Sequence, residues 1–219
     1  MRTAQADFNR PFFLGSLVPD YLSKIEGLDG ALQQPGARIA EIGPGCGWAA
    51  VALSNAYPQS IHEGFDLDGP RVESANANLA DAGLTDRARV FQQDAAEAQS
   101  QGQCDLVCAL ECIHDLPDPV GVLTTMRRLA KPGGRVIVMD ERCAEEFGAV
   151  GDLMERLSYG YSIMICLPDG MSRKPSAGTG TVMRPSTLDA YAREASFARA
   201  DVLPLEHDMF RFYDLVLTS

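Results

Sequence analysis

The sequence predicts a doubly wound α/β fold, with a seven-stranded, mostly parallel sheet that ends in an antiparallel hairpin. Three observations lead to this prediction. Short β-type runs alternate with amphipathic helical patterns between residues 37 and 140. A glycine-rich turn directly follows the first run, and two β-type runs stand next to each other at the carboxyl end. Strands that alternate with helices are typical of a parallel sheet covered by helices on both faces.

Three β-type runs and two helical patterns make up the first part of the alternation. The predicted strands are residues 37–42, 60–66 and 88–93. An Ala-rich helix over residues 46–57 ends before Pro58, since helices usually stop ahead of a proline. Gly83 is a typical stop for the second helix. The apolar face of that second helix is Val72, Ala75, Leu79 and Ala82.

Two more strands and one helix complete the alternation. Residues 104–110 are a continuous apolar run, as in a strand buried on both faces. Asp118 and Pro119 begin a helix as its N-cap and its first-turn proline. The apolar face of this helix is Val122, Leu123, Met126, Leu129 and Ala130. The KPGG segment at 131–134 closes the helix, and residues 135–139 predict the fifth strand.

A long insertion follows residue 140. Residues 141–185 are rich in Gly, Pro, Ser, Tyr and Met, and we expect them to form a lid or a substrate wall. A further helix begins near Ser186, and residues 198–205 and 210–218 predict the hairpin. Residues 1–35 are expected to form a helical cover on a single catalytic domain that spans residues 1–219.

Composition and charge exclude several classes of function. The 219 residues, 46% of them hydrophobic, suit one domain with a substantial core. The net charge of −11 is not interrupted by any cluster of Lys or Arg, which argues against nucleic acid or a membrane surface as a partner. No apolar run approaches the roughly 20 residues that span a bilayer, and no signal-peptide pattern is present. We therefore expect a cytoplasmic protein, monomeric or homodimeric, that acts on a small molecule.

The turn between the first strand and the first helix carries the strongest chemical signal. It reads EIGPGCGW over residues 41–48, with Gly43, Gly45 and Gly47 spaced two apart. Glycine lets a backbone adopt dihedrals that are closed to other residues and lets it approach a ligand closely. The helix that follows offers free N–H groups to an anionic group. A tight structural turn is the alternative interpretation.

Acidic residues follow the second and third strands. A carboxylate such as Asp66, at the end of the second strand, can accept hydrogen bonds from both ribose hydroxyls of an adenosine ligand. Asp68 is better suited to cap the next helix. Asp94 follows the third strand, where it could accept from the adenine amine, and an N-cap role is its alternative.

The ordered set of motifs resembles class I S-adenosylmethionine (SAM)-dependent methyltransferases, whose sheet is Rossmann-like. The resemblance rests on residues 41–48, 64–68, 94–95, 104–119 and 129–138, within roughly residues 36–140. Residues 166–185 and 207–215 further resemble a bacterial subgroup whose members often carry an N-terminal winged-helix dimerisation domain. The sequence before residue 36 is too short for that domain, so we expect it to be absent.

The resemblance implies SAM as cofactor, S-adenosylhomocysteine as product, and a set of binding residues. Glu41, Gly43, Gly45 and Gly47 would hold the methionine part, Asp66 and Leu67 the ribose, Asp94 and Ala95 the adenine, and Glu111 would line the methionyl end. Methyl transfer from a sulfonium is a one-step displacement, so no metal is required. Alignment and desolvation can supply roughly 7–11 kcal/mol of the barrier reduction.

A general base is needed only where the acceptor must lose a proton. The candidates past the fourth and fifth strands are His114, Asp115 and Glu141, with Arg142 as a clamp for an anionic group. His114 is the first choice, because a neutral imidazole accepts a proton near pH 7. A structural histidine is the alternative for His114, and a surface ion pair is the alternative for Glu141 and Arg142.

The acceptor is expected to be a small molecule with an oxygen, nitrogen or carbon nucleophile. Tyr159, Tyr161 and Met164 in the insertion are candidates for the wall of an apolar acceptor pocket, with ordinary packing as the alternative. Two other functions stay open. One is a non-catalytic module that binds SAM or a partner. The other is a nicotinamide-dependent oxidoreductase, although the spacing here is Gly-x-Gly-x-Gly rather than Gly-x-Gly-x-x-Gly.

Overall fold

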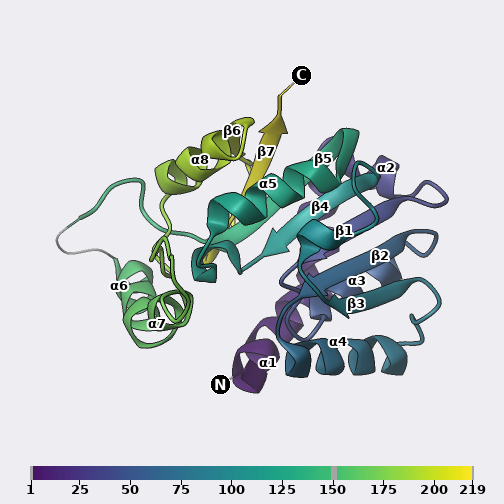
Figure 1. The fold of residues 1–219 in the computed structure, drawn as a ribbon, viewed down its shortest axis with the longest axis horizontal. Coiled ribbons are helices and arrows are strands. Elements are labelled where there is room, and N and C mark those ends of the chain that lie inside the picture. Colours follow the sequence, from purple (N-terminus) through teal and green to yellow (C-terminus); the bar gives the residue numbers. More distant parts are fainter. Residues whose placement is uncertain (1, 149–151, 219) are drawn as a thin grey trace. The chain divides into compact units, whose positions relative to one another are not determined.

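The computed structural model describes residues 2–148 and 152–218 (Figure 1). Residues 149–151, which belong to the expected insertion, lie outside the described residues, as do both terminal residues. The chain divides into two compact units. Unit 1 comprises residues 1–108 and 128–135, and unit 2 comprises residues 109–127 and 136–219. That residues 1–219 act as one catalytic domain stays a prediction.

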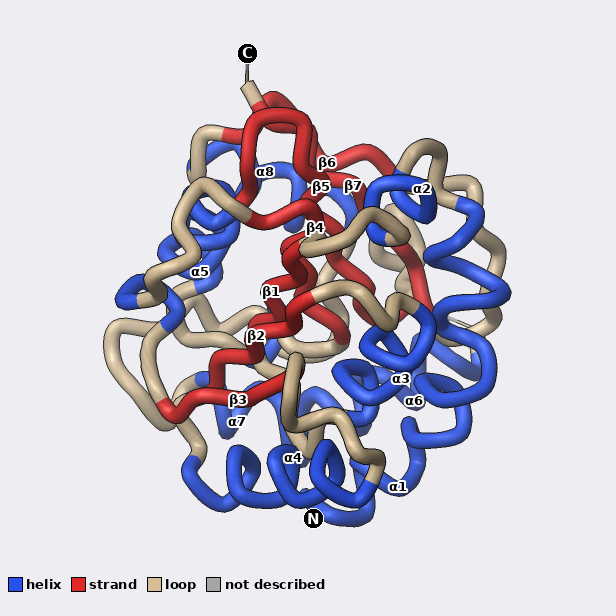
Figure 2. Tube along the Cα trace, turned by 90° about the vertical axis from the view of Figure 1, so that its right-hand side faces the viewer, coloured by secondary structure: helices blue, strands red, loops and turns tan. Residues whose placement is uncertain are grey.

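Seven strands form one mixed sheet in the order β3-β2-β1-β4-β5-β7-β6. They are β1 (Arg38–Ile42), β2 (Ile61–Asp66), β3 (Ala88–Gln92), β4 (Cys104–Leu110), β5 (Ala130–Glu141), β6 (Phe197–Val202) and β7 (Phe210–Leu217). β1, β2 and β3 pair in parallel and lie side by side in both views (Figures 1 and 2), whereas β7 pairs antiparallel with β5 and with β6. The predicted fold class is therefore confirmed.

Helices connect most of these strands. They are α1 (Arg2–Phe12), α2 (Leu28–Leu32), α3 (Trp48–Ala56), α4 (Gly69–Asp81), α5 (Pro119–Leu129), α6 (Leu153–Tyr161), α7 (Leu167–Gly170) and α8 (Pro185–Glu194). Shorter 3₁₀ and π-helical segments are η1 (Phe13–Tyr21), η2 (Leu22–Lys24), η3 (Ala95–Glu97), η4 (Ile113–Asp115) and η5 (Ser162–Cys166). Within residues 2–148 and 152–218, none of the helices has both the length and the apolar character that crossing a membrane requires.

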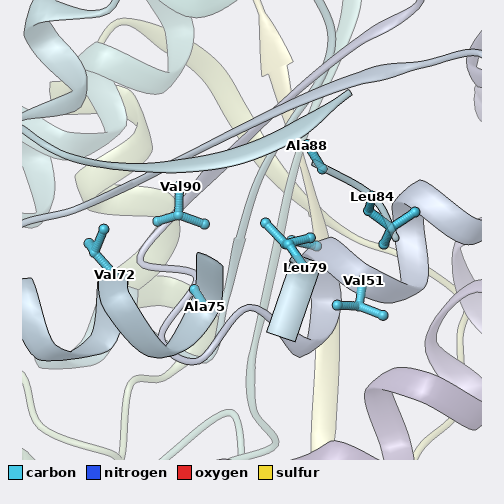
Figure 3. Close-up of a cluster of buried hydrophobic side chains, with 8 residues drawn as sticks. Val51, Val72, Ala75, Leu79, Leu84, Ala88 and Val90 are labelled. Atoms are coloured by element: carbon cyan, nitrogen blue, oxygen red, sulfur yellow. The ribbon is translucent and has the colours of Figure 1, made fainter. Parts of the chain in front are cut away.

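In unit 1, α3 and α4 bury small and branched side chains against β3. The cluster consists of Ala50 and Val51 of α3, Val72, Ala75 and Leu79 of α4, Leu84, and Ala88 and Val90 of β3. Figure 3 shows the α4 side chains on the side of the helix that faces the strand. Fully burying a Val or Leu side chain contributes about 1.5–3 kcal/mol. The predicted apolar face holds except for Ala82, which is exposed because α4 ends at Asp81.

The N-terminal segment of unit 1 is helical and packs on α3 through η1 and α1. The guanidinium of Arg10 lies 4.2 Å from the centre of the Trp48 ring, at the start of α3. The rings of Phe12 and Tyr21 lie 5.6 Å apart. The expected helices are therefore present, and their role as a cover on the catalytic domain stays a prediction.

In unit 2, the C-terminal hairpin of β6 and β7 is accompanied by α8. The Asp189 carboxylate of α8 accepts a hydrogen bond from the backbone N–H of Ala200 in β6, at 2.8 Å. Leu188 and Ala192 are fully buried on the inner face of the helix. This arrangement confirms the predicted hairpin and the predicted helix before it.

The insertion folds into α6, η5 and α7, and one arginine ties its two ends together. Arg184 Nη2 donates to Glu155 Oε1 of α6 at 2.7 Å and to the Tyr159 hydroxyl at 3.1 Å. Arg184 Nη1 donates to the backbone carbonyls of Ala144 and Glu146. The segment is thus a packed structure with its own polar clamp.

The start of β5 differs from the prediction. The KPGG segment is predicted to close the helix ahead of a strand at 135–139, but β5 begins at Ala130, directly after α5 ends at Leu129. Gly133 is left-handed, with φ of 77°. A Cβ on Gly134 would lie 2.5 Å from the Cys104 carbonyl oxygen of β4. Two glycines therefore let this backbone turn tightly and still run close to β4.

Candidate active site

The glycine-rich turn of unit 1 has the backbone geometry that its sequence predicts. Gly43, Gly45 and Gly47 have φ angles of 64°, 55° and 77°, in the left-handed region that favours glycine. A Cβ on Gly47 would lie 2.9 Å from that of Ala75, so close packing on α4 also requires glycine here. A Cβ on Gly45 would meet no atom of the described residues within 4 Å. The turn is therefore open beside Gly45, where a ligand can approach the backbone.

Asp66 ends β2 and its carboxylate is directed toward the same turn. Burial raises the pKa of Asp66, and the backbone amides of Asp68 and Gly45 act against that rise. Asp66 Oδ1 accepts a hydrogen bond from the Asp68 amide at 2.9 Å. Asp68 itself caps α4 by accepting from the Arg71 amide, as predicted. The next residue, Leu67, is 53% exposed, so an adenosine ligand can reach it.

Asp94 caps a short helix. Its Oδ1 accepts a hydrogen bond from the Ala96 amide at 2.9 Å, at the start of η3. The N-cap interpretation considered for Asp94 is therefore confirmed. Ala95 is buried directly after it. Contact between this pair and an adenine ring stays a prediction.

A buried side-chain contact that the sequence analysis did not identify involves Glu41, the residue at the start of the turn motif. His62 Nε2 of β2 and Glu41 Oε2 of β1 are 3.0 Å apart, and both side chains are almost fully buried. The available signal was a histidine in the predicted second strand. The contact with His62 explains how the polar Glu41 side chain can be buried. The predicted role of Glu41 toward the methionine part of SAM stays a prediction.

The candidates of unit 2 come together around His114. This residue lies in η4, just beyond the end of β4, and its side chain is 1% exposed. The insertion holds η4 in place, because the Gly180 amide donates to the His114 carbonyl and the Ala177 amide donates to that of Pro117. The Gly178–Gly180 segment therefore supports the backbone of the histidine.

Three carboxylates surround the His114 ring. Nδ1 lies 2.7 Å from Asp140 Oδ1 and 3.0 Å from Glu141 Oε2, and Nε2 lies 3.1 Å from Asp115 Oδ1. The structure thus brings together the three predicted residues His114, Asp115 and Glu141. It adds Asp140, which the sequence analysis missed. The signal for Asp140 was an acid at the end of the predicted apolar strand 135–139.

Charge within this group shifts the acidity of its members. Burial lowers the pKa of His114, but the Asp140 and Glu141 carboxylates outweigh burial and hold it well above its usual value. Burial raises the pKa of Asp140, but the His114 cation outweighs it and keeps that pKa below its usual value. An ionised carboxylate only accepts hydrogen bonds. His114 Nδ1 therefore carries the proton in the 2.7 Å bond to Asp140.

Two glutamates of the same group have raised pKa values. Burial raises the pKa of Glu141 to about 8, with Asp140 adding to the rise. Burial, followed by the charge of Glu141, raises the pKa of Glu111 well above its usual value. Glu111 has a left-handed φ of 59°, a strained conformation for this residue type. Its predicted position at the methionyl end of SAM stays a prediction, while its carboxyl belongs to the surroundings of His114.

The shifted Glu141 predicts a pH-dependent effect on stability. Between pH 4.5 and about 8 the folded protein keeps a proton that the unfolded chain has released, so this group makes the free energy of unfolding fall as pH rises. Glu141→Gln removes the titration. We expect the variant to gain thermal stability over the parent protein as pH rises from 5 to 8, in melting curves measured across that range. Glu146→Gln, the same change at an exposed position, should show no such trend. If the difference in thermal stability between Glu141→Gln and the parent did not change with pH, the raised pKa of the Glu141 carboxyl would be wrong.

The four residues predicted to contact the acceptor occupy different surroundings. Arg142 pairs with Glu206 at 3.2 Å and donates to the His207 carbonyl, so its surface ion pair is with Glu206 and not with Glu141. The Tyr159 hydroxyl is bound by Arg184. Tyr161 and Met164 are 48% and 71% exposed. Acceptor contact by any of them stays a prediction.

These features together define a class of protein. A glycine-rich turn between β1 and α3, a carboxylate at the end of β2 and the strand order β3-β2-β1-β4-β5-β7-β6 are the features of a class I SAM-dependent methyltransferase. The sequence profile of the methyltransferase domain family matches residues 16–201, and this chain belongs to that family. The family resemblance found in the sequence is therefore confirmed.

Curated relatives and solved structures agree with this assignment. The ubiquinone biosynthesis O-methyltransferase of Stutzerimonas stutzeri is 25% identical over 188 residues, which are 84% of this chain and 75% of that protein. The protein of the same name from Methylococcus capsulatus is 27% identical, over 73% of this chain and 62% of that protein.

Two solved structures share the fold. Mitomycin 7-O-methyltransferase MmcR has a TM-score of 0.74 at 20% identity, over 99% of this chain and 56% of that chain. NcsB1 from neocarzinostatin biosynthesis, solved with S-adenosylhomocysteine and 1,4-dihydroxy-2-naphthoic acid, has a TM-score of 0.71 at 17% identity, over 99% and 57%. This chain therefore spans little more than half the length of these two solved chains.

Proposed function

We propose that this protein transfers a methyl group from SAM to a hydroxyl oxygen of a small organic acceptor. Its family and the names of its relatives, among them ubiquinone biosynthesis O-methyltransferases, support the reaction class. An oxygen nucleophile is favoured by the buried histidine, because a hydroxyl must lose its proton as it is methylated. Six cysteines, all present as free thiols, suit the reducing cytoplasm. A monomer or a homodimer is compatible with this proposal.

The residues of unit 1 fit an adenosine-containing cofactor. The open space beside the Gly45 backbone leaves room for the carboxylate-bearing end of the cofactor. The Asp66 carboxylate, which interacts with the Gly45 amide of the same turn, would accept hydrogen bonds from the ribose hydroxyls. Leu67 and the pair Asp94–Ala95 follow on neighbouring strands for the ribose and the adenine. When bound, SAM supplies a methyl group that a sulfonium has already activated for displacement.

The single observation that carries the choice of base is the 2.7 Å contact between His114 Nδ1 and the buried Asp140. A proton fixed on Nδ1 leaves Nε2 as the nitrogen that can accept one. The methyl group that SAM would supply goes to the acceptor oxygen, which must release its proton. The hydroxyl proton passes to His114 Nε2. Asp140 is a positioning residue, since it orients the ring and stabilises the imidazolium.

The pH profile tests this assignment. The His114 cation cannot accept a proton, so kcat/KM should fall as pH drops, with the midpoint above the usual histidine value of 6.5. Asp140→Asn removes the charge that raises the His114 pKa, so the midpoint should move to lower pH. The assay contains EDTA to keep metal ions away. Asp169→Asn, an exposed change of the same charge, should leave the profile in place. If the midpoint of the pH profile were the same in Asp140→Asn as in the parent, His114 could not be the base whose pKa Asp140 raises.

The reaction class itself is tested by binding and turnover. Calorimetric titration with SAM, S-adenosylhomocysteine and NAD should show micromolar binding of the first two and none of the third. Mass spectrometry of a panel of phenols, hydroxyquinones, aryl amines and aliphatic alcohols should then detect a mass gain of one methylene on a hydroxyl compound. Binding of NAD alone would establish an oxidoreductase. SAM binding without methylation across the panel would favour a non-catalytic module.

A further inference from the structure

The other edge of the His114 ring carries a second group of ligand-type atoms. His114 Nε2, Asp115 Oδ1 and Cys166 Sγ all lie within 4.8 Å of one another. They come from η4 and from the end of η5, and α7 packs directly on η4. A Cβ on Gly170 of α7 would lie 2.9 Å from the Asp115 carbonyl oxygen, so the two segments are in close contact.

Two of these atoms are buried and lack a hydrogen-bond partner. His114 Nε2 and Asp115 Oδ1 are 3.1 Å apart, at ion-pair distance, but neither has a partner in good hydrogen-bond geometry among the described residues. The His114 side chain is 1% exposed. A buried polar atom without a partner costs about 1–3 kcal/mol. Such an atom, directed into a group of donors, points to a ligand that would pair with it.

The three donor atoms, and the hydrogen bond that orients the His114 ring, suit a zinc ion. Imidazole nitrogen, thiolate sulfur and carboxylate oxygen are the three donor types that Zn²⁺ takes in proteins, and three protein ligands leave one coordination position open. A zinc-bound histidine usually donates its other ring N–H to a carboxylate, which fixes its orientation. Asp140 already holds Nδ1–H in this way at 2.7 Å. The opposite edge of the ring, where Nδ1 faces Asp140 and Glu141, cannot bind a metal ion in the same way, because Nδ1 carries a proton and has no free lone pair.

We propose that His114, Asp115 and Cys166 form a Zn²⁺ site whose occupation inhibits the enzyme. The ion displaces the Cys166 thiol proton and any proton on His114 Nε2, and it binds the nitrogen that would otherwise accept the proton of the acceptor. No electron is transferred, and a chelator reverses the binding. Inhibition rests on the proposed function, whereas metal binding rests only on the geometry of unit 2.

Metal binding is measured first, on tag-free protein without SAM or acceptor. Zn²⁺ is titrated against a chromophoric chelator, and Co²⁺ is added separately as a spectroscopic probe. We expect one equivalent of Zn²⁺ to bind and the Co²⁺ protein to show a thiolate-to-cobalt charge-transfer band. Cys166→Ser should abolish the band and weaken Zn²⁺ binding by about tenfold or more, roughly 1.4 kcal/mol. Asp115→Asn should weaken Zn²⁺ binding but keep the band.

Two matched controls separate this site from other thiols. Cys143→Ser changes another buried cysteine of unit 2, whose thiol faces the Thr181 carbonyl. Cys46→Ser removes the partly exposed thiol of the glycine-rich turn. Both variants should bind Zn²⁺ as the parent does. Circular dichroism confirms that each variant is folded.

The outcomes distinguish the metal site from the reaction. No charge-transfer band in the parent protein, or unchanged Zn²⁺ affinity in folded Cys166→Ser, would overturn the site whatever the activity. If the site binds Zn²⁺ and methyl transfer occurs, Zn²⁺ should inhibit turnover and EDTA should restore it. Full turnover with one Zn²⁺ bound would overturn the inhibitory role. Failure of all methyl transfer would count against the proposed function alone, since the binding results stand independently.

Discussion

Replacing His114 by asparagine is expected to lower turnover by about 10²- to 10⁴-fold, the usual contribution of a positioned acid or base. Asparagine keeps an N–H that can reach Asp140 but offers no imidazole nitrogen to accept a proton. His114→Ala should lose as much turnover. It should also be less stable, because removing one partner of a buried charged pair costs about 3–5 kcal/mol. Single-turnover kinetics on an acceptor from the panel measures the loss in the methyl-transfer step.

The affinity for SAM decides whether that loss is specific. SAM binding in His114→Asn should stay within about threefold of the parent, roughly 0.65 kcal/mol. His207→Asn is the matched control, since His207 Nδ1 accepts from the Met209 and Phe210 amides in the turn before β7. Its turnover should be close to that of the parent. Unchanged turnover in His114→Asn would remove His114 from the mechanism.

Removing the Asp66 carboxylate should have the largest effect on cofactor binding. Hydrogen bonds to a charged group contribute about 1.5–3 kcal/mol, so Asp66→Ala is expected to weaken SAM binding by about 10- to 150-fold. The ribose hydroxyls would lose an acceptor that lies beside the glycine-rich turn. Calorimetric titration with SAM and with S-adenosylhomocysteine should show the same loss for both, because they share the ribose.

Asp68 supplies the control for this experiment. Asp68→Ala removes the N-cap of α4, and the loss of such a cap typically costs about 1 kcal/mol of stability. It should lower the melting temperature without weakening SAM binding by more than about threefold. If Asp66→Ala binds SAM within threefold of the parent while folded, the ribose assignment is wrong.

Local patterns in the sequence were sufficient for most of the fold. The strands at 37–42, 60–66 and 104–110 were predicted to within a residue at each end, because apolar β-type runs were bounded by glycine, proline or acidic residues. The start of β5 was missed. KPGG is a strong turn signal in isolation, but its backbone runs beside Cys104 of β4, and no local pattern reports that proximity.

The candidate site could be predicted only in part. The glycine-rich turn and Asp66 follow from a strand–turn–helix pattern, in which neighbours in space are also neighbours in sequence. His114 was recognisable by its position after the fourth strand. Asp140 was not, because an acid at the end of an apolar run resembles an ordinary strand terminus until its partner is known. The pairing of Glu41 with His62 was missed for the same reason.

The sequence by itself determined the order of the strands and helices, the cofactor motif and the family of this protein. These properties depend on short-range periodicity, on backbone dihedrals open to glycine and on the spacing of motifs along the chain. Only the tertiary structure decided which carboxylates surround His114, which of its nitrogens holds the proton and where the Cys166 thiol lies. Those properties depend on the contacts of His114 with Asp140 and Cys166, which lie 26 and 52 positions further along the chain. Burial strengthens these contacts, and a local sequence pattern cannot predict it.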